Sequence, residues 1–279
     1  MKDKICLITG GTDGIGKAAA YVLAQQGATL LLHGRDPDKG RRAVEELQAR
    51  SRNRAIEFLQ ADFGSLAQVR QLAATVKLRT ARLDVLINNA GGIFARRTLS
   101  EDGYEKTFAV NHLAPFLLTR LLLGTVKAAP SARIVNTASQ AHKGARIPFD
   151  DLQATRRYSA MGAYGTSKLA NILFTRVLAN QLKGTTVTAT CLHPGFVRTG
   201  FGRGLDSNVV AKHLFRFFAR FARTPEKGAE TLVYLASSPE VAGESGGYYF
   251  DCRPATPSAA ARDDASAERL WQVSEALVA

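Results

Sequence analysis

Short apolar runs alternate with longer amphipathic stretches along most of the chain. Runs such as CLIT, TLLL and DVLI are continuously apolar, which is typical of strands buried on both faces of a parallel sheet. Strands of that kind, separated by helices, predict right-handed crossovers and a doubly wound α/β fold with seven parallel strands. The strands are expected at residues 5–9, 29–33, 56–60, 85–88, 133–137, 186–192 and 247–250, and the helices at 15–26, 38–50, 66–79, 101–127, 160–183 and 226–237.

The pattern contains no repeat and no long linker. Only residues 254–264, rich in Pro, Ala and Ser, interrupt it before a last helix that carries Trp271. A length of 279 residues suits one large domain. We expect a single domain over residues 1–279, with a core at about 1–195, a following segment at about 196–224 and a C-terminal part at about 225–279.

Composition adds a basic excess to this picture. The chain has 37 Lys and Arg against 24 Asp and Glu, which gives a net charge of +13. Such a balance favours an anionic partner: nucleic acid, a membrane surface or a phosphate-bearing cofactor. The basic residues are scattered and no groove-reading motif accompanies them, so nucleic acid is not expected.

The three cysteines, Cys6, Cys191 and Cys252, form no CxxC pair and show no metal-ligand spacing. We therefore expect no metal site and a reducing, cytoplasmic environment. The longest apolar stretches, at residues 116–123 and 214–221, are interrupted by arginines. Neither approaches the roughly 20 residues that a membrane span needs.

A glycine-rich turn joins the first strand to the first helix. Residues 9–16 read TGGTDGIG, and Gly14, Gly16 and Ala19 fit the dinucleotide pattern GxGxxG/A. Glycines let the backbone approach a ligand, and the N-terminus of the helix offers N–H groups to a pyrophosphate. The turn therefore predicts a Rossmann-type dinucleotide site. Its candidate cofactor-binding residues are Gly10, Thr12, Asp13, Gly14 and Ile15.

The end of the second strand bears on which cofactor binds. A Rossmann protein that selects NAD usually carries an acidic residue there, whereas an Arg fits the 2′-phosphate of NADP. Here Arg35 follows the strand, and Asp36 precedes Pro37 and fits a helix N-cap. We therefore expect NADP(H), with Arg35 on the phosphate and Lys39 assisting. The other cofactor candidates follow the next two strands: Asp62 and Phe63 near the adenine, and Asn89, Ala90 and Gly91 at the cofactor edge of the sheet.

Three polar residues indicate acid–base chemistry. Tyr164 and Lys168 stand four apart in a helical segment and so share one face. A phenol titrates near ~10 in peptides, and a fixed ammonium beside it would lower that pKa. Ser139 ends the fifth strand, on the carboxyl side where open α/β sheets bind ligands. By contrast, His112, His142 and His193 lack metal-ligand spacing and are expected to be structural, hydrogen-bonded residues.

These motifs occur in the order of a known family. TGGTDGIG, NNAG, Asn111, Ser139, YGTSK and PGFVRT together resemble the short-chain dehydrogenase/reductase family over about residues 4–200. Further segments, among them FAVNHLAPFLLTRLLL, RIVNTASQAH, CLHPGFVRTG and SGGYYFDC, resemble its retinol dehydrogenase-like branch over essentially the whole chain. The sequence departs from that branch where TAS stands in place of the common VSS.

The resemblance implies a role for each matching residue. Tyr164 would be the general acid/base, and Lys168 would bind the nicotinamide ribose and lower the tyrosine's pKa. Ser139 would hydrogen-bond the substrate oxygen, and Asn111 would hold a water in a relay from Lys168. The remaining cofactor contacts would come from Tyr164 and Lys168 themselves and from Pro194, Gly195, Val197 and Thr199.

The expected function is that of an NADP-dependent oxidoreductase. It would interconvert a lipophilic aldehyde or ketone (retinoid-like, fatty, steroid or xenobiotic) and its alcohol. The alternative is a non-catalytic NADP-binding protein that acts as a redox sensor or scaffold. The intact Ser139, Tyr164 and Lys168 favour the enzyme.

Two further expectations concern partners. Residues 196–224 would form a helical substrate lid, in which residues 209–223 carry a basic stripe opposite a phenylalanine-rich face. An ordinary amphipathic helix explains that pattern, and a weak peripheral membrane contact is the sharper hypothesis. The second expectation is a homo-oligomer, because members of this family often form dimers or tetramers.

Overall fold

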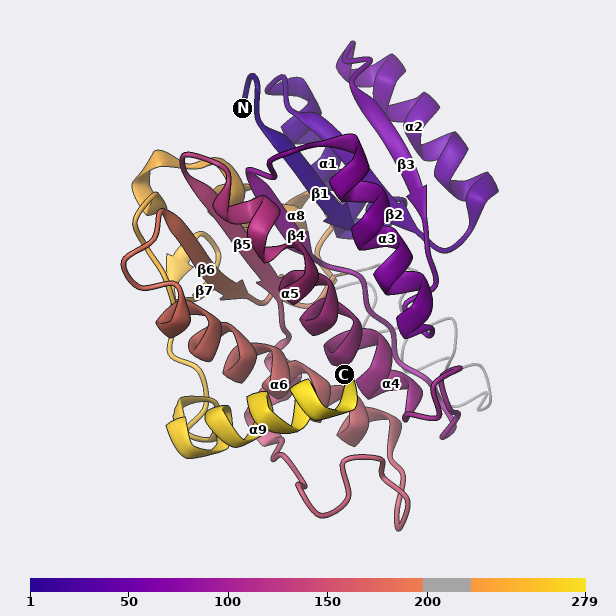
Figure 1. Cartoon of the computed structure of the whole chain (residues 1–279), viewed down its shortest axis with the longest axis vertical. Coiled ribbons are helices and arrows are strands. Elements are labelled where there is room, and N and C mark those ends of the chain that lie inside the picture. Colours follow the sequence, from indigo (N-terminus) through magenta and orange to yellow (C-terminus); the bar gives the residue numbers. More distant parts are fainter. Residues whose placement is uncertain (198–221) are drawn as a thin grey trace.

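The structure is a computed structural model, which describes residues 1–197 and 222–279. Its central feature is one sheet of eight strands in the order β3-β2-β1-β4-β5-β6-β7-β8 (Figure 1). The seven parallel strands confirm the expected doubly wound arrangement. These strands are β1 (Ile5–Thr9), β2 (Thr29–Gly34), β3 (Ile56–Gln60), β4 (Val85–Asn88), β5 (Ala132–Thr137), β6 (Val187–Leu192) and β7 (Tyr248–Phe250).

The eighth strand, β8 (Arg253–Pro254), was not expected. It pairs antiparallel with β7. Asp251 and Cys252 connect the two strands, and both have positive φ, 49° and 57°. A two-residue type I′ hairpin turn requires a positive φ at both central residues, and its usual sequences are Asn-Gly and Asp-Gly. The pair Asp-Cys carries no such signal.

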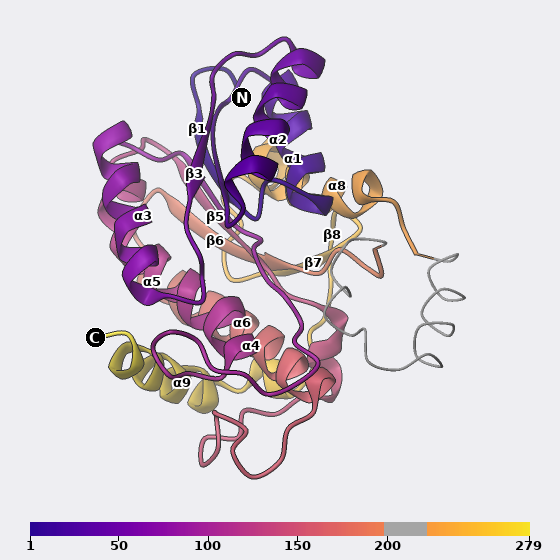
Figure 2. The ribbon, with the colours of Figure 1, turned by 90° about the vertical axis from the view of Figure 1, so that its right-hand side faces the viewer.

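Helices cover both faces of the sheet (Figure 2). The helices α1, α2 and α8 lie on one face, and α3, α5 and α6 lie on the other. A further helix, α9, packs on the outside of α6 and forms an additional layer (Figures 1 and 2). Their bounds are α1 (Gly14–Gln25), α2 (Pro37–Ser51), α3 (Leu66–Arg79), α4 (Lys106–Phe108), α5 (Ala114–Lys127), α6 (Ala160–Gln181), α8 (Pro225–Ser237) and α9 (Asp264–Leu277), with short turns η1 (Ala109–Leu113), η2 (Gln140–Gly144), η4 (Pro239–Val241) and η5 (Ala260–Arg262).

The two faces explain why the strands are continuously apolar. Along β1, Leu7 enters the core beneath α3, α5 and α6, whereas Cys6 and Ile8 enter the core beneath α1 and α8. Each of these side chains is fully buried. The cysteines Cys6 and Cys191 are thus packed in the core and not paired.

One expected helix begins later than the pattern suggested. The run at 101–127 starts only at Lys106, because Glu105 is the N-cap and its carboxylate accepts hydrogen bonds from the N–H groups of Thr107 and Phe108. The run then contains a π-helical turn, η1, between α4 and α5. The other expected helices agree with the structure within one or two residues.

Within the described residues, one helical stretch, Lys106–Lys127, is long and apolar enough to cross a membrane, with a mean hydropathy of 1.3. Its most apolar window is 72% buried inside the protein. Trp271 of α9 packs against Phe116 on this stretch, with ring centroids 4.9 Å apart. The burial therefore fits a core helix that packs against α3 and the sheet and touches α9 at Phe116.

Candidate active site

The main cavity, of about 810 Å³, opens at the carboxyl edge of the strands. This edge is where the strand order reverses between β1 and β4, the usual ligand position in an open α/β sheet. Sixteen of the residues expected at the site line this cavity: Gly10, Thr12, Asp13, Gly14, Ile15, Arg35, Lys39, Asn89, Ala90, Gly91, Ser139, Tyr164, Lys168, Pro194, Gly195 and Val197.

The glycine-rich turn forms one wall by close backbone contact. Gly10 has φ +64°, and a Cβ there would lie 2.9 Å from the Cα of Ala90. A Cβ on Gly16 would lie 2.2 Å from the carbonyl oxygen of Gly10. Asn89 connects the loop after β4 to the start of the glycine-rich turn, because its Nδ2 donates a hydrogen bond to the Thr9 carbonyl at 2.9 Å. Side chains at these glycines would therefore push the turn out of place.

The first turn of α1 presents its N-terminus to the cavity. Asp13 is the N-cap, and its side chain accepts a hydrogen bond from Gly14 N at 2.8 Å. The following N–H groups of this turn have no acceptor within the helix, as at every helix N-terminus. The ammonium of Lys39 lies 2.5 Å from Asp13 Oδ2, so it places a cation beside this anion-binding end.

Arg35 lies at the far end of the cavity. Its side chain is 69% exposed and lies 4.0 Å from Asp62 Oδ2, a distance that leaves the guanidinium available to a ligand. Asp36 caps α2 by accepting from Lys39 N at 3.0 Å, and this hydrogen bond lowers its pKa. The expected N-cap is thereby confirmed. Phe63 is buried and stacks on His33 with ring centroids 4.2 Å apart, so its ring does not line the cavity. Asp62 does not line the cavity either.

Ser139 and Tyr164 meet at the opposite end of the cavity. Ser139 is the N-cap of η2, where its Oγ accepts from Ala141 N at 3.2 Å. Its side chain also hydrogen-bonds Tyr164, which comes from the second turn of α6. The turn η2 packs closely on α6, since a Cβ on Gly165 would lie 2.8 Å from the Ala141 carbonyl oxygen. The two reactive hydroxyls are thus held together by backbone contact.

Lys168 lies one turn along α6 from Tyr164 and is fully enclosed. Its Nζ donates to the Thr137 carbonyl at 3.1 Å and lies 5.5 Å from the centre of the Tyr164 ring. Burial lowers the pKa of Lys168 to about 8. Burial also raises the pKa of Tyr164 to about 12, with the hydrogen bond from Ser139 acting in the opposite direction.

This direction differs from the expected lowering of the tyrosine pKa by Lys168. The physical reason is that burial penalises the phenolate and the ammonium alike, and the two groups lie a full helical turn apart. At neutral pH Tyr164 is therefore a neutral phenol, which is the form that donates a proton.

Asn111 lies in the π turn behind the cavity wall. Its Oδ1 accepts from Gly92 N at 2.8 Å, and its Nδ2 donates to the Gly92 carbonyl and to Ser167 Oγ. The side chain therefore fastens the loop after β4 to α6.

The residues present fit a dinucleotide. Beyond the glycine turn and the N-terminus of α1, the cavity wall contains two buried polar atoms, Asn89 Oδ1 and Thr137 Oγ1, that have no partner within the described part of the chain. Buried polar atoms of this kind are normally hydrogen-bonded, so they mark positions for ligand contacts. Gly91 lies beside Lys168, because a Cβ there would be 3.4 Å from the ammonium.

Sequence reasoning missed part of the lining. Met161 lies three residues before Tyr164 on α6, a spacing that places it on the same helical face and could have revealed it. Phe196 lies inside the PGFVRT motif. Both side chains are large, apolar and exposed, at 59% and 51%. The other missed lining residues are Ile93, Thr137, Ala138, Gln140 and Ala141.

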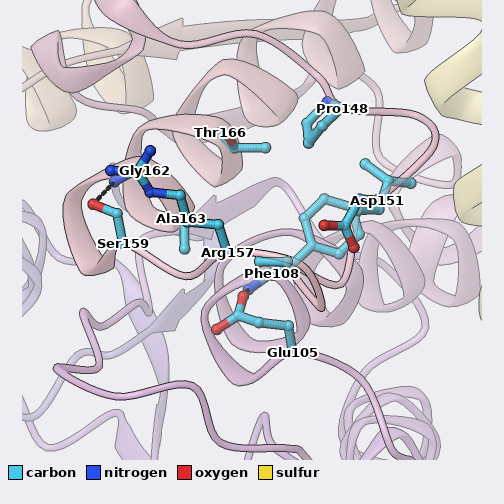
Figure 3. Close-up of a pocket in the computed structure, with 11 residues that line it drawn as sticks. Glu105, Phe108, Pro148, Asp151, Arg157, Ser159, Gly162, Ala163 and Thr166 are labelled. Atoms are coloured by element: carbon cyan, nitrogen blue, oxygen red, sulfur yellow. Dashed lines mark hydrogen bonds between the residues drawn. The ribbon is translucent and has the colours of Figure 1, made fainter.

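A second, smaller hollow of about 290 Å³ lies beside the first turn of α6 (Figure 3). None of the expected site residues lines it. Its two acids are occupied: Glu105 caps α4, and Asp151 accepts hydrogen bonds from Thr155 and Arg156 within its own loop. The dashed line in Figure 3 marks another local hydrogen bond, from Gly162 N to Ser159 Oγ. The polar groups of this hollow therefore serve the local structure.

Some expectations fall beyond the described residues. Thr199 and nearly all of the expected lid and of the helix at 209–223 lie outside residues 1–197 and 222–279. Within those ranges, no group of three His, Cys, Asp or Glu side chains could hold a metal ion.

Comparison with known proteins agrees with the geometry. The model of a family described as short chain dehydrogenase matches residues 4–209. The chain belongs to the short-chain dehydrogenase family. It is also retinol dehydrogenase-like: human retinol dehydrogenase 14 is 41% identical over 292 residues, which cover all of this chain and 87% of that protein.

Other short-chain dehydrogenase relatives extend this picture. A protein from Streptomyces sp. (strain C5) with the provisional name daunorubicin C-13 ketoreductase DnrU is 45% identical, covering all of this chain and 93% of its own. Among solved structures, an uncharacterised protein from Mycobacterium paratuberculosis has a TM-score of 0.80 at 31% identity, covering 99% of this chain and 94% of that one. An actinorhodin polyketide ketoreductase with NADPH has a TM-score of 0.70 at 25% identity, covering 89% and 96%.

Proposed function

We propose that this short-chain dehydrogenase reduces bulky apolar aldehydes or ketones to alcohols with NADPH, and catalyses the reverse reaction with NADP⁺. The observation that carries the proposal is the hydrogen-bonded pair of Ser139 and Tyr164 at the edge of the main cavity, with Lys168 beneath it. Two hydroxyls from different elements that meet in a cavity can both donate to one substrate oxygen.

The residues act on the substrate oxygen. When bound, the reduced nicotinamide supplies the hydride to the carbonyl carbon. Tyr164 donates its phenol proton to the carbonyl oxygen, and the hydroxyl of Ser139 donates a hydrogen bond to the same oxygen. The raised pKa of Tyr164 keeps it protonated before the reaction. Lys168 then favours return of a proton to the phenolate, because its own pKa of about 8 allows it to exchange protons near neutral pH.

The preference for NADP(H) rests on Arg35. The guanidinium is exposed at the adenosine end of the cavity, and Lys39 adds a second cation nearby. Guanidinium–phosphate hydrogen bonds are charge-assisted and among the stronger ones in proteins. Asp36, the nearest acid along the chain, is engaged as the N-cap of α2.

The substrate class rests on the catalytic mouth. Met161, on α6 near Tyr164, and Phe196, in the segment after β6, are exposed apolar side chains that line the cavity. Isolated surface leucines are common, but two large apolar residues at one cavity mouth favour an apolar ligand. The names of the relatives, retinol dehydrogenases and a daunorubicin C-13 ketoreductase, point the same way.

Turnover measurements test the proposal. Purified protein is mixed with NADPH or NADH and a panel of carbonyls that runs from a short aldehyde to retinal and a polycyclic ketone. We expect cofactor oxidation that is faster with NADPH and with the bulky substrates. Cofactor binding without turnover of any carbonyl would instead support the alternative, a redox sensor or scaffold.

Location and assembly remain predictions. The cytoplasmic placement, the weak membrane contact and the homo-oligomer rest on composition, on residues 209–223 and on the family resemblance. Co-sedimentation with anionic vesicles at low and high salt checks the membrane contact, and sedimentation velocity checks the oligomer.

A further inference from the structure

The C-terminal residues contact two turns next to the candidate site: η2, which follows Ser139, and η1, which contains Asn111. We call residues 255–279 the tail segment; it lies beyond the residues that the family model matches and includes α9. Figures 1 and 2 show α9 lying across α6, on the side away from the sheet. Two hydrogen bonds run from this segment to histidines that neighbour Ser139 and Asn111.

The first bond fixes the turn that carries Ser139. His142 Nε2 accepts from the backbone N–H of Ser258 at 3.1 Å. A backbone amide only donates, so Nε2 carries no proton, and the proton of the neutral ring is on Nδ1. Nδ1 therefore donates to the Ser139 carbonyl at 2.7 Å. The buried ring bridges the tail segment and the backbone of the catalytic serine.

The second bond fixes the π turn that carries Asn111. The fully buried ring of His112 has Nε2 at 2.8 Å from Ser274 Oγ and Nδ1 at 3.4 Å from Asn171 Oδ1. The Asn171 oxygen only accepts, so Nδ1 carries the proton and the Ser274 hydroxyl donates to Nε2. Again a neutral histidine with a proton on Nδ1 connects the tail segment to a residue next to the candidate site.

We propose that the tail segment positions the active site, with His142 and His112 as neutral struts that hold the Ser139 turn and the Asn111 turn. Neither histidine touches the cavity, so both are positioning residues and not catalytic ones. The inference rests on the proposed function for its activity readout, and on the hydrogen bonds alone for its structural readout. Misplacing a reacting group by about 1 Å can lower a rate about 10²-fold.

The surroundings of His142 keep it neutral. Tyr248 of β7 faces its ring edge-on with centroids 5.2 Å apart, and the hydroxyl of Tyr248 is bonded to His193. Lys143 on the same turn adds repulsion to a positive charge on the ring. A proton on Nε2 would also oppose the N–H of Ser258. Burial lowers the pKa of His142, in line with these contacts.

Matched substitutions at His142 separate the two bonds. In His142→Asn the amide can still donate to the Ser139 carbonyl, as Nδ1 does, but it cannot reach Ser258. In His142→Gln the longer side chain can accept from Ser258, as Nε2 does, but does not hold Ser139. Ser258→Ala is the control, because it keeps the backbone donor and removes a hydroxyl that has no partner among the described residues.

The expected result is a fall in kcat with unchanged cofactor affinity. We expect kcat to fall about tenfold or more in His142→Gln and less in His142→Asn, with the NADPH dissociation constant within about twofold of wild type. Ser258→Ala should match wild type. In wild type, kcat should fall as the pH drops below 6.5 and His142 gains a proton; both His142 variants should lack this part of the profile.

Hydrogen exchange gives the readout that does not depend on activity. Exchange in the peptide that contains residues 139–144 should rise in both His142 variants, while exchange in the glycine-rich turn stays unchanged. Ser274→Ala should raise exchange around residues 109–113 in the same way. Wild-type kcat and unchanged exchange in His142→Gln would overturn the proposal. Altered exchange in a protein that reduces no carbonyl would leave the struts in place and overturn the proposed function instead.

Discussion

The two ends of the main cavity are built by different means. We call the part of the cavity formed by the glycine-rich turn, the N-terminus of α1 and Arg35 the cofactor end, and the part around Ser139, Tyr164 and Lys168 the catalytic end. At the cofactor end, glycines bring backbone atoms together, and the charged groups, Arg35 and Lys39, are partly exposed. At the catalytic end, Tyr164 and Lys168 are enclosed side chains whose pKa values are shifted by burial. Exposed charges are screened by water, whereas enclosed ones interact strongly with their surroundings. Under the proposed function, the cofactor end would recognise shape and charge, and the catalytic end would change protonation.

The largest expected effect is at the catalytic end. Tyr164→Phe keeps the ring and removes the proton that is transferred, so turnover should fall by roughly 10²-fold or more. NADPH affinity should stay nearly unchanged, because the expected phosphate contacts lie at the other end of the cavity. Steady-state kinetics and a cofactor titration measure the two quantities. A variant that keeps the wild-type rate would exclude Tyr164 as the acid.

The second prediction concerns a substitution that disrupts the backbone packing at the cofactor end. Gly16→Ala places a methyl group 2.2 Å from the Gly10 carbonyl oxygen, so the turn must move. We expect NADPH affinity to fall about tenfold or more, since the backbone donors of this turn are displaced. Gly124→Ala on α5 is the control, because a Cβ there meets nothing within 4 Å. Equal affinities in the two variants would show that close backbone contact is not what builds this end.

The third prediction tests charge at the same end. Arg35→Asp removes a cation and adds an anion, so the preference for NADPH over NADH should narrow or invert, by about tenfold or more. Arg42→Asp makes the same change of charge on α2 at a residue that does not line the cavity, and should have little effect. The readout is the ratio of the two cofactor affinities. Equal binding of both cofactors by wild type would contradict the role of Arg35.

The last prediction concerns acid stability rather than activity. Burial lowers the pKa of His33, beside the cofactor end, and of His112, behind the catalytic end, from 6.5 to about 4. Between these values the unfolded chain binds more protons than the folded one, so stability is full above pH 6.5 and falls as the pH drops towards 4. Each histidine contributes up to about 1.4 kcal/mol per pH unit. Urea unfolding at several pH values measures the slope, which His33→Leu should reduce. An unchanged slope would argue against a neutral, buried His33.

The sequence predicts the local parts of the site better than its long-range supports, for a physical reason. The glycine turn, the N-cap at Asp36 and the strands around them follow from residues close together in the chain. The strut from His142 to Ser258 joins residues 116 positions apart. No local pattern announces such a contact, and none announces the two-residue strand β8.

Two further differences come from competition between local signals. The apolar pattern from 101 to 127 extends beyond the helix, and only the side chain of Glu105, which caps it, shows where it starts. The spacing of Tyr164 and Lys168 is read correctly from the chain. The direction of the tyrosine pKa is not, because it depends on how deeply both residues are buried. Burial is a property of the whole fold.

The position of α9 at the end of the chain also has a consequence for folding during synthesis on the ribosome. The apolar stretch Lys106–Lys127 leaves the ribosome long before α6 and α9, which pack beside it in the folded protein. At about 5 to 20 residues per second, the roughly 150 residues between Lys127 and the end of α9 need about 8 to 30 s. Through that interval a helix that resembles a membrane span lacks part of its packing, including the contact of Phe116 with Trp271. Nascent chains should therefore engage chaperones or membrane-targeting factors until translation is complete, and a premature stop before Trp271 should leave the product prone to aggregation.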